Sequence, residues 1–319
     1  MAVTVVRYLL DNAIFWGVLD GQDIIPAPYD FETTGAFLSG TTPQGLKALD
    51  GPRVPLSRVR LLSPVTRNQR FVCQGANYRQ HMIESGLDPD TKHYNMIFTK
   101  APSCIVAADA DVVRPRRVRF LDYEVELGLI LRRDIAGPVT VTQDTLFDFI
   151  AGAVIVNDIS ARDIQIPEMQ FHKGKSFRTF GPVGPYLCIF EREDMAALAD
   201  MELSLSVNGQ LRQSDNTRNL VFGPAETLTE LSAVHDFSAG DLLATGTPSG
   251  CALAVPSPAR QRLGALLPDK MKWKIFFRIQ AKRSQYLQPG DVIETRIASG
   301  DGRIDLGVQR NRIVAEGEA

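Results

Sequence analysis

Three carboxylates alternate along one apolar segment of the sequence. Asp122, Glu124 and Glu126 lie in FLDYEVELGLIL, and residues two apart point to the same face of a β-strand. Like charges this close either raise the pKa values of the carboxyl groups or bind a cation. A site made only of oxygen ligands favours Mg²⁺, Mn²⁺ or Ca²⁺ over zinc. The alternative is an acidic strand that faces solvent.

A fourth carboxylate favours the metal site over that alternative. Asp158 directly follows another apolar segment, GAVIVND, and an Asp at the end of a buried strand can complete a cage of three carboxylates. The residues between the acidic ones are then expected in the core: Tyr123, Val125, Leu127 and Leu129. The sequence therefore predicts a divalent-cation site carried by two buried strands.

A second constellation combines imidazole with a carboxylate. GANYRQHMIESG predicts a short helix over 78–85, delimited by residues with capping chemistry: Asn77, Gln80 and Gly86. His81 and Glu84 are three residues apart and share a helix face. A carboxylate beside an imidazole holds its tautomer and raises its basicity, which water activation requires. An exposed pair without a role is the alternative.

Two further segments offer groups for an anionic substrate. Lys175 lies between a flexible Gly and an aromatic residue in KGKSFRTFGPVGPYLC, where it is suited to contact a carboxylate. In LLATGTPSG, Thr245 and Thr247 provide hydroxyls in a Gly-rich loop after a strand. A loop needed only for its turn geometry is the alternative. Neither GxGxxG nor GxxxxGK[ST] occurs, so no motif supports nucleotide binding.

Many short apolar runs bounded by Gly, Pro and Asp follow Phe71 and predict a β-rich sandwich or barrel. Helices are expected only at about 78–85, 142–150 and 225–233. Two N-terminal runs, VTVVRYLL and AIFWGVLDG, predict a hairpin. We predict a small N-terminal domain over residues 1–66 and a catalytic domain over 67–319.

A basic insertion, residues 256–285, interrupts the last part of the chain. It carries eight Lys and Arg residues against a single acidic one, Asp269. Its middle, MKWKIFFRI, alternates well enough to predict a strand. The insertion is interpreted either as a solvated loop between strands, as a basic flap over an anionic substrate, or as part of a subunit interface.

The composition is that of an ordinary soluble protein. The 319 residues are 44% hydrophobic, with 35 basic and 37 acidic side chains, a balance that argues against nucleic-acid binding. Neither a signal peptide nor a membrane-spanning helix is expected. The four cysteines form no CxxC pair, which predicts free thiols and a reducing, cytoplasmic environment: Cys73, Cys104, Cys188 and Cys251.

Taken together, these segments resemble the fumarylacetoacetate hydrolase (FAH) superfamily. The resemblance rests on GANYRQHMIESG, FTKAPS, DYEVELGLIL, AGAVIVNDISARDIQ, GKSFRTFGPVGP, VNGQLRQSDNT, GDLLATGTPSG and LQPGDVIE, in the family's order. It implies a β-rich α+β fold, the mixed β-sandwich roll of the FAH C-terminal domain after a small N-terminal domain, and commonly a homodimer. It also implies Mg²⁺ or Mn²⁺, with Ca²⁺ possible in crystals, held by Glu124, Glu126 and Asp158, with Asp122 orienting the ligands or metal-bound water.

The same resemblance implies roles for other residues. His81 and Glu84 match a lid that activates water. The remaining matches lie near the substrate's carboxylate and oxo groups: Lys175, Gln165, Thr247, Lys100 and Arg162. The basic insertion after Gly250 departs from the family pattern, because the chain there normally reaches the LQPGD segment in far fewer residues. The insertion therefore leaves the shape of the substrate open.

We interpret the sequence as a metal-dependent hydrolase that cleaves a C–C bond in a β-diketo acid, such as an acylpyruvate, and releases pyruvate or a related acid. The same metal-enolate site would also serve an oxaloacetate decarboxylase, a 2-oxo acid isomerase or hydratase, or hydrolysis of a 2,4-diketo sugar acid. A non-catalytic binder of organic acids is an alternative of another class. The expected partner is a small oxo acid, without nucleic acid or membrane.

Overall fold

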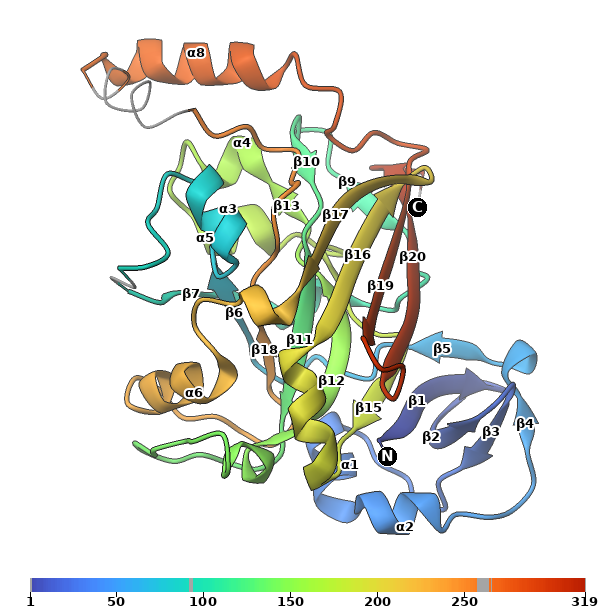
Figure 1. Cartoon of the computed structure of the whole chain (residues 1–319). Coiled ribbons are helices and arrows are strands. Elements are labelled where there is room, and N and C mark those ends of the chain that lie inside the picture. Colours follow the sequence, from blue (N-terminus) through green and yellow to red (C-terminus); the bar gives the residue numbers. More distant parts are fainter. Residues whose placement is uncertain (1, 92–93, 257–263, 265, 319) are drawn as a thin grey trace.

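Two β-sheets form the body of the molecule (Figure 1). The computed structural model describes residues 2–91, 94–256, 264 and 266–318, so part of the basic insertion lies outside the described residues. The larger sheet has 11 strands: β1 (Val3–Leu10), β2 (Ala13–Asp20), β3 (Asp23–Pro26), β4 (Val54–Pro55), β5 (Arg60–Leu62), β6 (Phe71–Gly75), β7 (Met96–Lys100), β11 (Val125–Leu131), β12 (Ile150–Asn157), β15 (Leu187–Ile189) and β18 (Leu242–Ala244).

The smaller sheet has 5 strands: β9 (Val112–Arg114), β16 (Met201–Val207), β17 (Gln210–Asn216), β19 (Val292–Ser299) and β20 (Asp305–Ala315). Two short ladders join β10 (Leu121–Asp122) to β13 (Ser160–Ala161) and β8 (Ile105–Val106) to β14 (Gly181–Pro182). Both large sheets mix parallel and antiparallel pairs, since β18 runs parallel to β6 and β20 to β9. The β-rich architecture predicted from the short apolar runs is confirmed.

The described helices are few, and all are short except the 12-residue helix α8. The α-helices are α1 (Thr34–Gly40), α2 (Pro43–Lys47), α3 (Arg79–Glu84), α4 (Arg162–Gln165), α5 (Phe171–Lys175), α6 (Pro224–Ser232) and α8 (Asp269–Gln280). The 3₁₀ helices are η1 (Leu56–Arg58), η2 (Pro102–Cys104), η3 (Leu146–Asp148), η4 (Arg192–Ala199) and η5 (Thr217–Asn219). No helix among the described residues is long and apolar enough to cross a membrane.

The core lies between the two sheets and around β11 and β12. Every residue of these two strands is buried, which explains why their sequences are almost continuously apolar. Tyr123, Val125, Leu127 and Leu129 are buried as predicted. All four cysteines are free thiols, and three of them are buried in this interior. β11 and β12, next to the predicted carboxylates, therefore lie deep in the interior.

The N-terminal hairpin is confirmed and extends the larger sheet. β1 pairs with β2 through a two-residue turn, Asp11 and Asn12, whose positive φ angles of 49° and 66° suit the twist of the strands. β1 also pairs with β15, which in turn pairs with β12. The predicted N-terminal segment is thus continuous by hydrogen bonds with the strands of the larger sheet.

Two of the three expected helices form, as α3 and α6. The helix predicted over 142–150 is wrong, because only the 3₁₀ turn η3 forms there. Thr142 and Thr145 hydrogen-bond to each other's backbone and side chain, an arrangement that competes with helical bonding. The chain then enters β12 at Ile150.

The capping predicted for α3 is only partly correct. Asn77 is not the N-cap; its amide instead donates to the backbone oxygens of Phe222 and Thr245. No side-chain cap forms, so Gln80 does not complete a capping box. Gly86 does end the helix, with a positive φ of 80° and a hydrogen bond to the preceding turn. Asn77 therefore ties the start of α3 to the loops on either side of the site.

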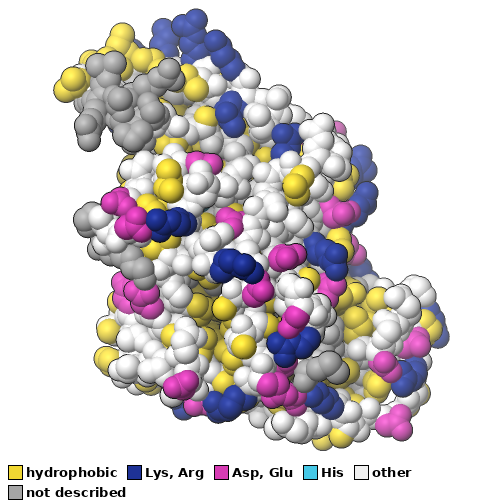
Figure 2. Space-filling view, viewed as in Figure 1, with side chains coloured by type: hydrophobic (Ala, Val, Ile, Leu, Met, Phe, Trp, Pro, Cys, Tyr) yellow, Lys and Arg dark blue, Asp and Glu magenta, His cyan; other side chains and the backbone are white. Residues whose placement is uncertain are grey.

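The strand predicted over 271–279 is wrong, since this segment belongs to the helix α8. Its aromatic residues satisfy helical spacing as well as alternation: Trp273, Phe276 and Phe277 are three and four residues apart. Phe276 and Phe277 pack against Phe120. α8 projects from the body (Figure 1), and Figure 2 shows Lys and Arg side chains along it at the top of the view.

Candidate active site

A pocket of about 630 Å³ opens between α3, the pair α4 and α5, and the loop after β18. Most of the residues predicted from the sequence line it: His81, Glu84, Glu124, Glu126, Arg162, Gln165, Lys175 and Thr247. They come from segments far apart in the chain, which the larger sheet and its flanking helices bring together. The sequence and the structure thus point to the same cavity.

The acidic segment that contributes to this pocket is not one regular strand, contrary to the prediction. β10 ends at Asp122 and pairs with β13, whereas β11 begins at Val125 and pairs with β12 and β18. Between them, the backbone N–H of Glu124 donates to the side-chain oxygen of Asn157 at 3.0 Å. A side chain therefore replaces a ladder bond, and the alternation of the three carboxylates is broken at this point.

Asp122 consequently separates from the other acidic groups. Its carboxylate accepts the Arg162 guanidinium at 2.8 Å and the backbone N–H groups of Ala252 and Leu253 at 2.7 and 3.0 Å. It connects the buried Arg162 to the loop after β18. From this position it can fix the orientation of Arg162.

The predicted ligand set forms a compact cluster. Glu124, Glu126 and Asp158 each offer one oxygen, and these oxygens lie within 4.8 Å of one another. Asp158 stands directly after β12, and its backbone N–H donates to the Glu124 carbonyl at 2.9 Å. Three buried oxygens at this spacing fit a hard divalent cation such as Mg²⁺ or Mn²⁺.

Three buried cations compensate these carboxylates. The Lys175 ammonium contacts both Glu124 and Asp158. Lys100 donates to Asp158 at 2.5 Å, and Arg162 donates to Glu124 at 2.5 Å. Burial by itself lowers the pKa of Lys175, but the charges of Asp158 and Glu124 outweigh it and the pKa is raised. Lys175 is therefore held as a cation.

The two glutamates have opposite protonation tendencies. Burial alone raises the pKa of Glu124, but Arg162 and Lys175 outweigh it and hold the pKa well below its usual range. The pKa of Glu126 is raised well above its usual value by burial, and then by the charges of Asp158 and Glu124. Among the described residues, the Glu126 carboxylate accepts one hydrogen bond, from the backbone N–H of Gly246 at 3.0 Å. A divalent cation would supply the charge that Glu126 lacks, so the residues present fit a metal.

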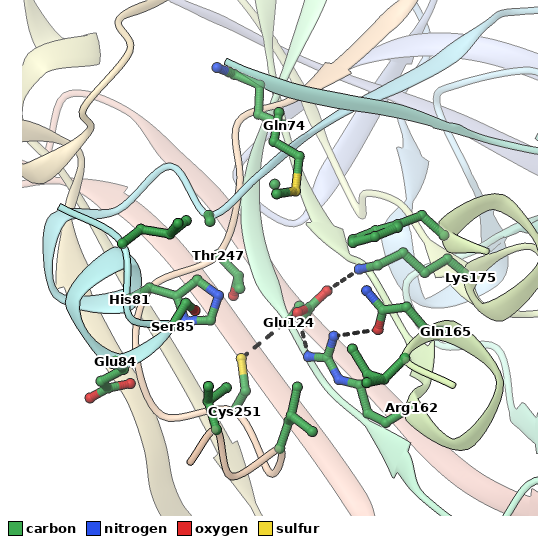
Figure 3. A pocket seen from close by; sticks show the side chains of 18 of the residues that line it. Gln74, His81, Glu84, Ser85, Glu124, Arg162, Gln165, Lys175, Thr247 and Cys251 are labelled. Atoms are coloured by element: carbon green, nitrogen blue, oxygen red, sulfur yellow. Dashed lines mark hydrogen bonds and ion pairs between the residues drawn. The ribbon is translucent and has the colours of Figure 1, made fainter. Parts of the chain in front are cut away.

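His81 and Glu84 both line the pocket, but His81 points toward Glu124 whereas Glu84 points away from it (Figure 3). The imidazole lies on the side of the cavity facing Glu124, while the Glu84 carboxylate is exposed and, within the described part of the chain, receives one 3.5 Å hydrogen bond, from Gln80. Burial lowers the pKa of His81; Glu124 opposes this effect and Arg162 adds to it. The imidazole is therefore neutral near pH 7 and can accept a proton.

The predicted substrate contacts fall into two groups. Gln165 and Thr247 are buried and line the pocket, with the Gln165 oxygen accepting from Arg162 and the Thr247 hydroxyl from Gln213. Lys100 lies beneath Asp158 and donates also to a backbone oxygen at 2.7 Å, and it is not among the pocket-lining residues. Lys100 is thus placed to support Asp158.

Several lining residues were missed in the sequence. Cys251 places its sulfur 3.9 Å from a Glu124 oxygen, and burial raises its pKa well above the usual value. Phe98 and Phe171 contribute an aromatic wall, with the Lys175 ammonium 5.0 Å from the Phe98 ring centre. Arg283 reaches the pocket from the end of the basic insertion. Phe98 begins the FTKAPS segment, but no local pattern marks it or the others as pocket residues, because tertiary packing brings them here.

Most of the chain matches a known family. The model for the fumarylacetoacetate (FAA) hydrolase C-terminal domain matches residues 70–314. An oxaloacetate tautomerase of Bacillus subtilis is 35% identical over 212 residues, which make up 66% of this chain and 68% of that protein. The first 69 residues lie outside the family match.

Two solved structures resemble the whole chain. Fumarylacetoacetate hydrolase from the psychrophile Exiguobacterium antarcticum is 29% identical, with a TM-score of 0.73, and the match covers 98% of this chain and 99% of that one. 2-Hydroxyhepta-2,4-diene-1,7-dioate isomerase from Mycobacterium marinum is 24% identical, with a TM-score of 0.71 and coverage of 99% and 100%. The second likeness shows a common fold alone.

Proposed function

The chain belongs to the fumarylacetoacetate hydrolase family, and on this premise we propose that it is a divalent-metal enzyme that interconverts the keto and enol forms of a 2-oxo acid. One observation carries the proposal: the neutral imidazole of His81 faces the buried cluster of carboxylates and cations, while the exposed Glu84 carboxylate at the pocket rim points away from it. Transfer of a proton between carbon and oxygen needs one base and a site for negative charge, and both are present.

The metal ligands, His81 and Lys175 have separate roles in this proton transfer. Mg²⁺ or Mn²⁺ held by Glu124, Glu126 and Asp158 would supply Lewis-acid polarisation of the oxo oxygen. His81 accepts the proton from the carbon next to the oxo group, so the C–H bond breaks, its electron pair forms the C=C bond, and the π pair of the C=O bond moves to the oxygen. The Lys175 cation stabilises that charge. His81 then returns the proton to the oxygen, and no water is consumed.

Hydrolytic C–C cleavage is the second candidate, and a specific feature favours it. His81 and Glu84 keep the three-residue spacing on α3, and the relative from Exiguobacterium antarcticum is named a hydrolase. Hydrolysis requires Glu84 to turn toward His81 so that the pair can deprotonate water. Decarboxylation of a β-oxo acid would use the same enolate without that water.

The test follows the decay of enol absorbance, and separately pyruvate release from an acylpyruvate, in metal-stripped and Mn²⁺-restored enzyme. We expect Glu84→Gln to retain keto–enol activity within about threefold, because the exposed carboxylate takes no part in the proton transfer. Loss of both activities in this variant would favour the hydrolase, and absence of any metal-dependent keto–enol turnover would refute the proposal. Gln80→Ala, on the same exposed face of α3, is the matched control.

A pH profile tests the role of His81. Because the base must be neutral, kcat/KM is expected to stay level at neutral pH and to fall as the pH drops through the lowered pKa of His81, below its usual 6.5. His81→Gln should lose this limb of the profile and reduce kcat/KM by about 10²- to 10⁴-fold. An unchanged acid limb in the variant would assign the titration to another group.

Other parts of the proposal rest on the family resemblance and on composition. We propose a homodimer, located in the cytoplasm, that acts on a small oxo acid. The free thiols agree with a reducing compartment, and the near-balanced charge supports neither a nucleic-acid nor a membrane partner.

A further inference from the structure

The end of the basic insertion is fastened to the rim of the pocket. The Gln280 amide exchanges two hydrogen bonds with the backbone of Ala254, donating at 2.8 Å and accepting at 3.3 Å. The Tyr286 hydroxyl donates to the same Gln280 oxygen at 2.7 Å. The chain that follows α8 therefore returns from the projecting helix to the pocket rim at a defined position (Figure 1).

This return places one arginine in the pocket wall. Arg283 is half-buried, lines the pocket, and donates through Nε to the backbone oxygen of Ala252 at 2.5 Å. No other hydrogen bond or ion pair of Arg283 occurs within the described residues. Its two terminal nitrogens therefore donate to no protein acceptor among the residues that the structure describes.

The other pocket cations are already neutralised. Arg162 pairs with Asp122 and Glu124, and Lys175 pairs with Glu124 and Asp158. Arg283, by contrast, contacts only a neutral carbonyl among the described residues. Among the described residues, it is the pocket cation without a carboxylate partner, so its charge is not offset before a ligand binds.

The hydrogen bonds also fix where this charge lies relative to the cluster. Arg162 donates to Asp122, and Asp122 accepts the backbone N–H of Ala252, whose carbonyl receives Arg283. Arg283 is therefore linked to the buried ion pairs through Ala252 and Asp122, and it lies nearer the protein surface than they do. Leu253, which also lines the pocket, follows Ala252 directly and adds an apolar surface beside this path.

We propose that Arg283 binds the far carboxylate of the substrate, which is therefore a dicarboxylic 2-oxo acid. The inference rests on the proposed function for the end that carries the oxo group. A substrate held there by the metal cluster extends outward along the apolar rim and meets the Arg283 guanidinium, whose planar donors match a carboxylate with two parallel hydrogen bonds. The basic insertion thus supplies a specificity residue in the pocket wall.

Binding to the Mn²⁺-loaded protein tests this inference without turnover. Calorimetry compares two acids of equal chain length, 2-oxoadipate and 2-oxohexanoate, which differ in the far carboxylate. We expect the dicarboxylate to bind wild type at least about 10-fold more tightly, the effect of one charge-assisted hydrogen-bonded pair. Arg283→Gln should reduce this preference to within about twofold, and Arg283→Lys should restore part of it.

Lys282→Gln is the matched control, since Lys282 is the exposed neighbour with the same charge and does not line the pocket. A wild-type protein without the preference, or an Arg283→Gln variant that weakens both acids equally, would overturn the inference. A protein that prefers the dicarboxylate but shows no keto–enol turnover would refute the proposed function and leave the role of Arg283 intact. Keto–enol turnover without a preference for the dicarboxylate would refute the role of Arg283 and leave the proposed function intact. Binding of neither acid would refute both.

Discussion

Replacing Glu124 with alanine is expected to abolish metal-dependent turnover and to weaken Mn²⁺ binding by about 100-fold or more, the loss seen when a metal site is disturbed. Glu124 accepts from Lys175 and Arg162 and belongs to the triad with oxygens within 4.8 Å. Its removal deletes one ligand and leaves two buried cations without their shared carboxylate. The metal-free protein should therefore also lose about 3 kcal/mol of stability.

The measurement is a Mn²⁺ titration of stripped enzyme, followed by electron paramagnetic resonance, alongside the unfolding curve in chelator. Glu124→Gln keeps the shape of the side chain and separates loss of charge from loss of packing. Glu202→Ala removes an exposed carboxylate from β16 and should change neither reading. Full activity together with unchanged Mn²⁺ affinity in Glu124→Ala would contradict the assignment of the triad.

The gathering of carboxylates was predictable from short-range rules, whereas the exact set, Glu124, Glu126 and Asp158, came from the family resemblance. Glu126 lies on β11 and Asp158 directly after β12, two paired strands whose buried, apolar residues were evident from the sequence. The position of Asp122 was not predictable, because alternation assumes an unbroken ladder. The Asn157 side chain interrupts that ladder at Glu124, and no local pattern in the sequence signals such a substitution.

The helix α8 was misassigned for a related reason. In a short aromatic and basic segment, the spacing of Trp273, Phe276 and Phe277 fits both a strand and a helix face. Packing against Phe120 selects the helix. Phe120 lies about 150 residues earlier in the chain, so the deciding contact is outside any local window.

The ion pairs in the site could likewise not be predicted from the sequence. Lys100 ends β7 and Lys175 ends α5, yet both ammonium groups meet at Asp158. A resemblance could place these lysines near a substrate, but only the assembled fold shows that they are held by carboxylates. The resting cluster thus contains its own counter-cations, and a metal must share its ligands with them.

Lys175→Met is expected to bind metal more tightly and to turn over more slowly. In wild type the Lys175 ammonium contacts Glu124 and Asp158, two of the three triad ligands, and so competes with a divalent cation. Without it, Glu124 keeps only Arg162 and Asp158 only Lys100 as a cationic partner among the described residues, and the metal-free variant should lose about 3 kcal/mol of unfolding free energy. Mn²⁺ should then raise the melting temperature of the variant more than that of wild type.

Turnover should nevertheless fall by about 10²- to 10³-fold, because the cation that stabilises the developing oxygen charge is gone. This combination separates a catalytic cation from one that merely neutralises empty ligands, since a neutralising lysine would be replaced by the metal without loss of rate. Lys173→Met is the control: it lies on the same helix, α5, but its ammonium is exposed and pairs with Glu168. Wild-type turnover in Lys175→Met, or an unaltered response to Mn²⁺, would show that Lys175 neither catalyses nor competes.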